Sequence, residues 1–211
     1  MAVFWHAELV LEALTGTGLA ASAGLNAYIP LILVGLLTRF TDVITLPEQW
    51  QWLSNPWVLG ILGVLLAIEF VADKVPAVDH ANDVLQTVVR PTSGGLVFGA
   101  AASAQTATVT DPAAFFQDNK WVPVAVGIAI ALVIHLMKAT ARAGVNAVTA
   151  GFGAPVASTI EDVVSVSMAL AAILLPVLVL VFLVLMVLFF WWALRRRKRR
   201  KAARLTAARG Y

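Results

Sequence analysis

The densest group of side chains able to do chemistry lies in IEFVADKVPAVDHANDVLQTVVRP, residues 68–91, between two apolar stretches. Its polar members include Glu69, Asp73, Lys74, Asp79, His80, Asn82, Asp83 and Arg90. Glu69 and Asp73 are spaced i, i+4, as are Asp79 and Asp83, so each pair would share one face of a helix. Oxygen ligands at this density suit hard cations or protons. If the segment is embedded in a membrane, these groups are candidates for an ion pathway.

Two interpretations of this segment differ in depth. In the first, residues 77–89 form a short re-entrant or amphipathic helix between Pro76 and Pro91, and its polar side chains line a hydrated cavity. In the second, the segment is a solvated outer loop in which Lys74 neutralises Asp73. A different chemistry also fits, because a divalent metal could be held by Asp79, His80 and Asp83.

Further polar groups occur near other expected helix ends. Glu161 and Asp162 precede a long apolar run, either as carboxylates facing the same cavity or as acids that complement the N-terminus of a helix. Gly16-Thr17-Gly18 and Gly151-Phe152-Gly153 indicate either backbone that approaches an ion or flexible loops. His135 and Lys138 are a second candidate proton or anion site, unless Lys138 extends outward to the membrane surface.

An internal repeat relates these groups. With an offset of 64 residues, 57–107 aligns with 121–171 at 11 of 51 positions, including the pair Asn82 and Asn146. A fainter third copy begins at AGLNAYIP, where Asn26 takes the same place. The repeat units, 2–39, 57–108 and 121–194, would each read helix, polar break with Asn, helix, with the three Asn on the outer side. Repeats and broken helices are typical of secondary transporters, although duplication of a helical hairpin without transport explains the pattern too.

The elements that position these residues are membrane helices. Apolar residues make up 60% of the 211 residues, charged residues 13%, and the mean hydropathy is +0.86. Apolar stretches lie near 24–38, 57–72, 92–108, 121–137 and 163–194, the last long enough to kink at Pro176, and residues 2–15 form a further helix whose crossing stays open. The fold class expected is an all-α integral membrane protein with five or six transmembrane helices, re-entrant or broken polar segments and internal repeats.

The charge is divided between two parts of the chain. Residues 195–211 hold nine of the 15 Lys and Arg and none of the 12 acids, which leaves the body, residues 1–194, at about −6. Behind Trp191 and Trp192 this run predicts a cytoplasmic C-terminus in a multi-pass inner-membrane protein. Anionic lipids are the partner expected for Arg195, Arg196, Arg197, Lys198, Arg199, Arg200 and Lys201. The basic pI describes this tail, so no specific nucleic-acid binding is expected.

Several classes of chemistry are excluded or disfavoured. The chain has no Cys, which excludes disulfides and thiolate sites. It has no phosphate-binding loop, HExxH motif or GxSxG elbow, so ATP-driven transport by this chain alone is not expected. The first residues carry Glu8 and Glu12 and lack a basic leader, so no signal peptide is expected. A bound cation is the one cofactor the sequence suggests.

Three segments carry a resemblance to a known family: AGLNAYIPLILVGLLTRF, IEFVADKVPAVDHANDVLQTVVRP and AGVNAVTAGFGAPVASTIEDV. They resemble the bacterial membrane family called domain of unknown function 4126 over residues 15–175, with the basic tail outside. The resemblance implies a bacterial membrane protein and supplies no catalytic residues.

Three functional hypotheses follow. The first is a channel or secondary transporter for a cation or small polar solute, with Asn26, Asn82 and Asn146 at helix breaks and the carboxylates supplying negative field. The second is a metal-assisted lipid-modifying enzyme that uses Asp73, Asp79, His80 and Asp83. The third is a non-catalytic membrane scaffold or subunit. A homo-oligomer or a membrane complex fits the small residues at 94–104, which permit close helix packing.

Overall fold

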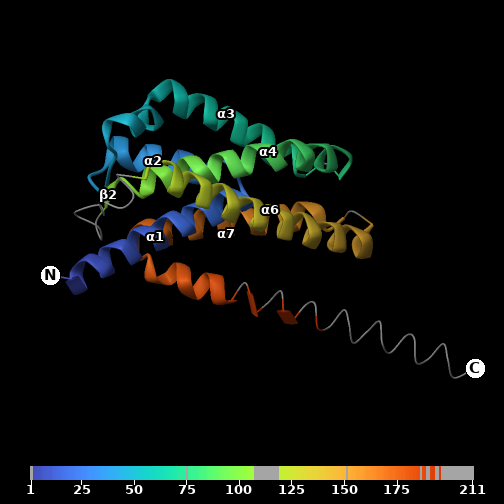
Figure 1. The fold of residues 1–211 in the computed structure, drawn as a ribbon. Coiled ribbons are helices and arrows are strands. Elements are labelled where there is room, and N and C mark those ends of the chain that lie inside the picture. The colour runs from blue at the N-terminus through green and yellow to red at the C-terminus, as the bar shows by residue number, and fades with distance from the viewer. Residues whose placement is uncertain are drawn as a thin grey trace, which may run out of the picture. The chain divides into compact units, whose positions relative to one another are not determined.

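The computed structural model describes residues 2–74, 76–106, 119–150, 152–185, 187–188, 191–192 and 195, and within these not the side chains of 2–7, 76–81 and 83. The chain divides into two compact units, Met1–Val179 and Leu180–Tyr211. The elements of the first unit are α1 (Ala2–Leu25), α2 (Tyr28–Phe40), β1 (Ile44–Thr45), η1 (Glu48–Ser54), α3 (Pro56–Ala72), α4 (Pro76–Ala101), β2 (Gln105–Thr106), α6 (Trp121–Thr149) and α7 (Ala154–Leu174). Figure 1 shows that the protein is helical, as the sequence predicts.

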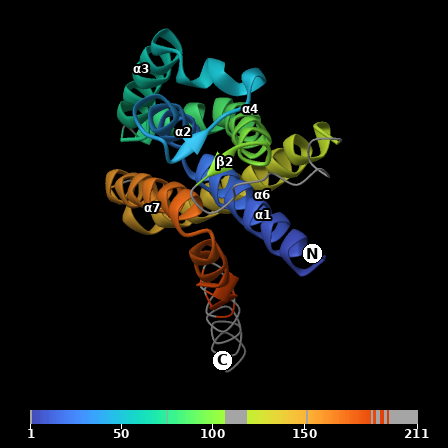
Figure 2. The ribbon, with the colours of Figure 1, turned by 90° about the vertical axis from the view of Figure 1, so that its left-hand side faces the viewer.

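Helix α1 packs against α4, α6 and α7 (Figures 1 and 2). The prediction of a helix over 2–15 followed by flexible glycines is wrong, because α1 continues through Gly16 and Gly18. A Cβ on Gly16 would lie 2.7 Å from the ring of Phe98, and one on Gly18 would lie 2.6 Å from Ala172. These glycines therefore let α4 and α7 approach α1, and tertiary contact offsets their low helix propensity.

Helices α4 and α6 cross where both carry glycine. A Cβ on Gly94 would lie 2.7 Å from the carbonyl oxygen of Gly127, and one on Gly127 would meet the backbone of Gly94 in turn. Small residues allow backbones to approach closely in membrane bundles. The close packing expected at 94–104 is thus found within one chain.

Helix α4 runs through Pro91, which corrects the prediction of a short helix over 77–89 that ends there. A proline inside a helix costs about 3 kcal/mol, since it removes one hydrogen bond and crowds the preceding turn. The buried position of Pro91 and the hydrogen bond from Ser93 Oγ to the Ala27 carbonyl oxygen place this turn against the rest of the bundle. Packing on both sides of the proline therefore holds the helix continuous.

The repeat predicted from sequence does not have common helix boundaries in its two better copies. Lys74 lies in the turn after α3, whereas its partner Lys138 lies inside α6. Asn82 and Asn146 lie inside α4 and α6, so the prediction that they mark helix breaks is wrong. A helix tolerates Asn where the side chain finds a tertiary partner, as Asn82 does at Asp73. Of the three Asn residues, Asn26 is the one at a break.

The connection from α2 to α3 contains elements that the sequence did not predict. β1 and β2 pair in antiparallel register, with Ile44 opposite Thr106. Residues 48–54 form the 3₁₀ helix η1, where Leu53 is fully buried and Trp52 is exposed. Strands of two residues are too short to leave a period-2 pattern.

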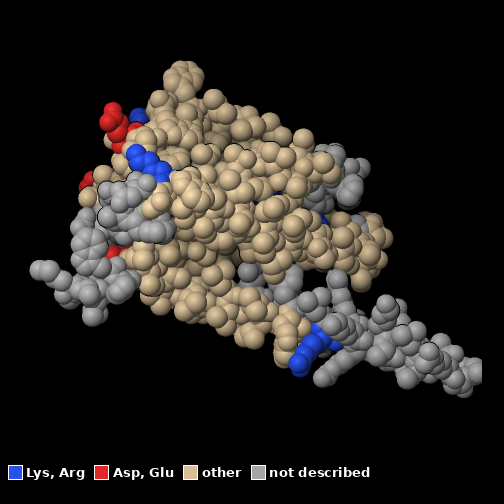
Figure 3. All heavy atoms as spheres, viewed as in Figure 1, with Lys and Arg blue, Asp and Glu red and all other residues tan. Residues whose placement is uncertain are grey.

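Two described helices, α6 and α7, are long and apolar enough to cross a bilayer, and η1 with α3, bent by 55°, would make a third span. The chain breaks after Leu174 at 175–176 and is helical again from 177 to 185, which confirms the predicted kink at Pro176. Large apolar side chains, among them Trp57, Val64 and Ile68 of α3, face outward. Figure 3 shows a face on which charged side chains occupy little of the surface. These features are those of a membrane protein.

A buried ionic network beside a broken helix

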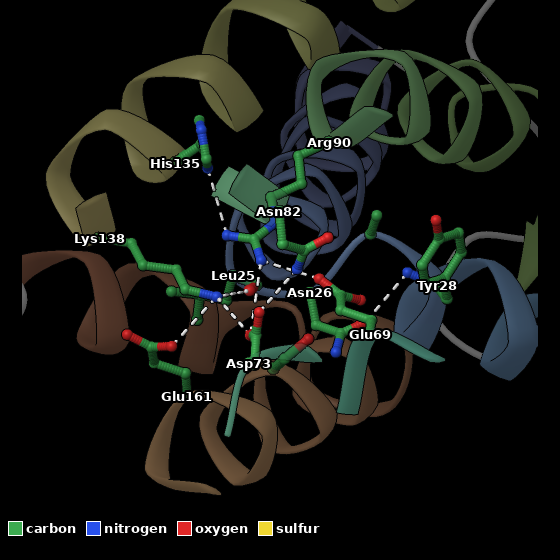
Figure 4. Close-up of polar contacts among 12 residues, drawn as sticks. Leu25, Asn26, Tyr28, Glu69, Asp73, Asn82, Arg90, His135, Lys138 and Glu161 are labelled. Carbon is green, nitrogen blue, oxygen red and sulfur yellow. Dashed lines mark hydrogen bonds and ion pairs between the residues drawn. The ribbon is translucent and has the colours of Figure 1, made fainter. Parts of the chain in front are cut away.

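Asp73 is the centre of a buried ionic network (Figure 4). It lies in the turn that follows α3. Its Oδ2 atom is 3.2 Å from Arg142 Nη2, 3.6 Å from Lys138 Nζ and 3.9 Å from Arg90 Nη2. Its Oδ1 atom accepts a hydrogen bond of 2.8 Å from Asn82 Nδ2. One carboxylate thus contacts α4 and α6 at once.

Two further carboxylates complete the network. Glu69 Oε1 lies 2.8 Å from Arg90 Nη2. Glu161 Oε2 of α7 lies 2.6 Å from Arg142 Nη2 and 3.1 Å from Lys138 Nζ. Three carboxylates therefore face three cations, and the pairing compensates the cost of removing them from water. Glu161, at 16% side-chain exposure, is the most accessible of the six, whereas the others are at most 3% exposed.

The three cations decide the ionisation of Asp73. Burial alone would raise the pKa of its carboxyl, but Lys138, Arg142 and Arg90 outweigh burial and hold the pKa below its ordinary value. Asp73 is therefore ionised at neutral pH and supplies a fixed negative charge to the network.

His135 joins the network as a neutral side chain. Its Nδ1 atom lies 3.2 Å from Arg90 Nη1. A guanidinium can only donate, so Nδ1 accepts and carries no proton. The ring proton is then assigned to Nε2, which donates to Thr87 Oγ1 at 3.0 Å. Protonation of Nδ1 would cost the contact with Arg90.

The break between α1 and α2 lies against the same network. Lys138 Nζ donates a hydrogen bond of 2.8 Å to the Leu25 carbonyl oxygen, the last residue of α1. Asn26 Oδ1 accepts from the N–H groups of Tyr28 and Ile29 in the first turn of α2, and Asn26 Nδ2 donates to Asp162 Oδ1 at 2.9 Å. The negative end of α1 thus contacts a cation, and the positive end of α2 lies beside a carboxylate, which is the favourable arrangement of both helix dipoles.

Several buried polar atoms of this region have no hydrogen-bond partner among the described residues. The acceptors are Glu69 Oε2, Gln86 Oε1, Asn146 Oδ1 and Asp162 Oδ2, and Ser158 Oγ can accept or donate. Arg90 Nε is a buried donor that also has no hydrogen-bond partner among the described residues. Each such atom costs about 1–3 kcal/mol, so a native structure needs a reason for it.

The structure brings together six of the residues singled out from sequence, which are Asn26, Glu69, Asp73, Asn82, Glu161 and Asp162. Asn146 lies one helical turn beyond Arg142 on α6. The side chains of Asp79, His80 and Asp83 lie outside the described residues, so the metal site proposed for them stays a prediction. Within the described part of the chain, no group of three His, Asp or Glu is arranged to hold a metal ion.

The basic tail is described at one residue. The Arg195 guanidinium stacks on the Trp191 ring, 3.8 Å from its centroid. The lipid-binding candidates from 196 to 201 lie outside the described residues.

Sequence reasoning named Arg90 only as one member of the polar segment and did not name Arg142, and the option that Lys138 extends to the surface is wrong because this side chain is buried. The spacing of polar residues along α6 could have indicated the network. His135, Lys138 and Arg142 are spaced i, i+3, i+7, which places them on one face of a helix. An apolar helix with one polar face predicts a buried partner of opposite charge.

Apolar outer faces around a buried ionic network define a class, the α-helical membrane proteins with an internal polar site. Within this class, the chain belongs to the family described as domain of unknown function (DUF4126), whose model matches residues 13–196. The match confirms the resemblance noted in the sequence. Comparison with curated proteins and with solved structures gave no match.

Proposed function

We propose that the protein is a secondary transporter or channel for a cation or small polar solute, and that solute passes the α1–α2 break beside Asp73. The single observation that carries the proposal is the broken helix whose two ends lie beside charged groups: the buried Lys138 bonds to the last carbonyl of α1, and the half-buried Asp162 bonds to Asn26, which caps α2. Half-helix ends that meet near charged groups are the usual binding sites of secondary transporters.

The proposal includes five or six membrane crossings in a bacterial inner membrane. α1 has 24 residues and α4 has 26, so they are about 36 and 39 Å long and exceed the roughly 30 Å hydrocarbon core. Of their charged residues, Glu12 and Arg90 are buried inside the bundle. With α6, α7 and the bent pair of η1 and α3, these helices supply five crossings, whereas α2, with 13 residues and about 20 Å, is too short to cross alone.

A purely structural role explains the network less well. Replacing a buried ion pair by well-packed apolar residues is often neutral or stabilising, so a six-membered charged network inside a membrane protein is an expensive way to gain stability. Ionisable groups inside membrane bundles usually mark ion or substrate pathways. Asp73, which contacts cations of two helices, is positioned to exchange partners if those helices move.

The proposal is tested by flux in proteoliposomes. Purified protein would be assayed with radioactive Na⁺ and Rb⁺, a pH-sensitive dye and a panel of labelled polar solutes. Asp73→Asn and Asn26→Ala should lower the flux of the transported species at least tenfold, as should Asn82→Ala, whereas Glu48→Gln at the exposed start of η1 is the matched control. Flux that is unchanged in all three site variants would overturn the assignment.

The outcome also separates the other two hypotheses. A scaffold or subunit predicts no flux with any probe and variants that alter only stability or co-purification with another protein. The metal-assisted lipid enzyme depends on Asp79, His80 and Asp83. This hypothesis predicts turnover of a lipid phosphate that Asp79→Asn abolishes, and no flux in the transport assays. No described contact favours the enzyme over transport.

A further inference from the structure

We propose that Lys138 and Arg142 form a binding site for the carboxylate group of a small solute, and that the carboxylate of Glu161 occupies this site in the present structure. Glu161 Oε2 lies 2.6 Å from Arg142 Nη2 and 3.1 Å from Lys138 Nζ. One carboxylate oxygen therefore contacts both cations, and such charge-assisted contacts are how proteins recognise carboxylates. The inference rests on the proposed function and names the class of solute.

Glu161 shares its two cations with Asp73. Asp73 Oδ2 lies 3.2 Å from Arg142 Nη2 and 3.6 Å from Lys138 Nζ, so each contact of Glu161 is the shorter of the two. Figure 4 shows the Lys138 side chain reaching toward both carboxylates. Asp73 also accepts a hydrogen bond of 2.8 Å from Asn82. Asp73 therefore holds the two cations in place when Glu161 turns away from them.

Glu161 is the accessible member of this cluster. Its side chain is 16% exposed, whereas those of Lys138 and Arg142 are 2% and 1% exposed. Charged side chains within membrane bundles face the interior or a water-filled space and not lipid, so the open part of Glu161 marks the side from which water reaches the network. A solute arriving from water would therefore meet Glu161 before the buried cations.

The charge balance favours a group with one negative charge. The network pairs three carboxylates with three cations, so the five groups that remain when Glu161 turns away carry a net charge of +1. A carboxylate from a solute restores neutrality, whereas an uncharged solute would leave a buried cation uncompensated, which is costly. Lys138 Nζ also donates to the Leu25 carbonyl oxygen, which places this site at the α1–α2 break of the proposed pathway.

The test is saturation-transfer NMR of the purified full-length protein in phosphatidylcholine nanodiscs, in chloride-free buffer, with acetate as the probe and acetamide as its uncharged analogue. The unmodified protein should transfer saturation to acetate and not to acetamide. Glu161→Gln removes the internal competitor and should lower the acetate dissociation constant about tenfold, as expected if Glu161 occupies the site in about nine of ten molecules.

Two further variants complete the experiment. Arg142→Met removes a cation of the site and keeps the basic tail, so loss of the acetate signal in this variant would locate the binding at the network. Glu48→Gln, at the exposed start of η1, is the matched control, because it changes the net charge of the protein as Glu161→Gln does and should leave the acetate dissociation constant unchanged.

Tighter acetate binding in Glu161→Gln supports the site, because a carboxylate with a purely structural role would not compete with acetate. An acetate dissociation constant that is unchanged or higher in Glu161→Gln overturns the proposal, and this result decides even if Arg142→Met does not fold. Displacement of acetate by an equal concentration of chloride overturns the assignment to carboxylates.

Flux separates this inference from the proposed function. Acetate binding with the expected response to Glu161→Gln, but without flux of any solute, supports the site and counts against transport. Flux of Na⁺ or Rb⁺ that is lost in Asp73→Asn, without acetate binding, supports the proposed function and overturns the carboxylate site.

Discussion

At the residue scale, the molecule is organised around Asp73. Its two oxygens contact three cations and one amide, and these four groups come from α4 and α6 alone. Glu161 and Glu69 then bind the outer sides of the same cations, so neither helix can move without exchanging ionic partners. Replacing Asp73 should therefore disturb the ionic contacts of the whole network.

Asp73→Asn should lower the free energy of unfolding by about 3 kcal/mol, because it leaves three buried cations to share two carboxylates. The amide keeps the size of the side chain, so the loss reports charge and not packing. Asp42→Asn, on an exposed residue between α2 and β1, is the control and should change stability by less than 0.5 kcal/mol. Unfolding in mixed SDS micelles measures both, and equal stability of the two variants would contradict a paired network.

The pairing of Arg142 with Glu161 should show direct energetic coupling. Their 2.6 Å contact joins α6 to α7, and one partner is almost fully buried. A double-mutant cycle with Arg142→Met and Glu161→Gln should give a coupling energy of about 1–3 kcal/mol. Additive effects of the two changes would mean that Glu161 contributes nothing to holding the guanidinium, and that Asp73 alone compensates it.

At the element scale, small residues set the distance between helices. Gly94 of α4 and Gly127 of α6 touch through their backbones, whereas nothing lies within 4 Å of a Cβ added at Gly60 or Gly63 of α3. Glycine therefore has different structural roles on α4 and α3. On α4, glycine lets the backbones of α4 and α6 approach closely, and on α3 it lies on an open face.

Gly94→Ala should destabilise the protein by about 2 kcal/mol, because overpacking of a close crossing forces backbone shifts. Gly60→Ala is the matched control, with open space for the new methyl group, and should raise stability by up to about 1 kcal/mol through helix propensity. Thermal unfolding in detergent would measure both, and destabilisation by the two changes alike would mean that the open face of α3 is covered in the native protein.

The same scale separates what sequence could predict from what it could not. Apolar length located most of the helices, and the polar residues Glu69, Asp73 and Asp162 were found because charge inside apolar sequence is conspicuous. The helix ends predicted at Gly16, Gly18 and Pro91 were wrong. Glycine and proline favour a helix break locally, but packing against other helices keeps α1 and α4 continuous there. The ionic partners of Arg90 and Arg142 were not predicted, because these partners lie 21 and 19 residues away in sequence.

At the scale of the whole molecule, charge is separated into a body of about −6 and a strongly basic C-terminal segment. The network holds six of the 18 charged residues of the body, while the nine basic residues of 195–211 lie together in sequence. Lys and Arg near the end of a membrane helix favour the cytoplasmic side. The tail is therefore the part of the chain expected to determine its orientation in the membrane.

Replacing the seven basic residues of 195–201 by Gln should reduce the fraction of molecules whose C-terminus is cytoplasmic, because Arg204 and Arg209 are then the basic residues left in the tail. A reporter that is active on only one side of the membrane, fused after Tyr211, measures that fraction directly. Replacing Glu8 and Glu12 by Gln is the control, since acidic residues contribute little to topology. A C-terminus that stays fully cytoplasmic in the Gln variant would mean that residues 1–194 determine the orientation. Binding to anionic lipid would then be the remaining role of the tail, and binding of the unmodified protein to anionic vesicles would measure it.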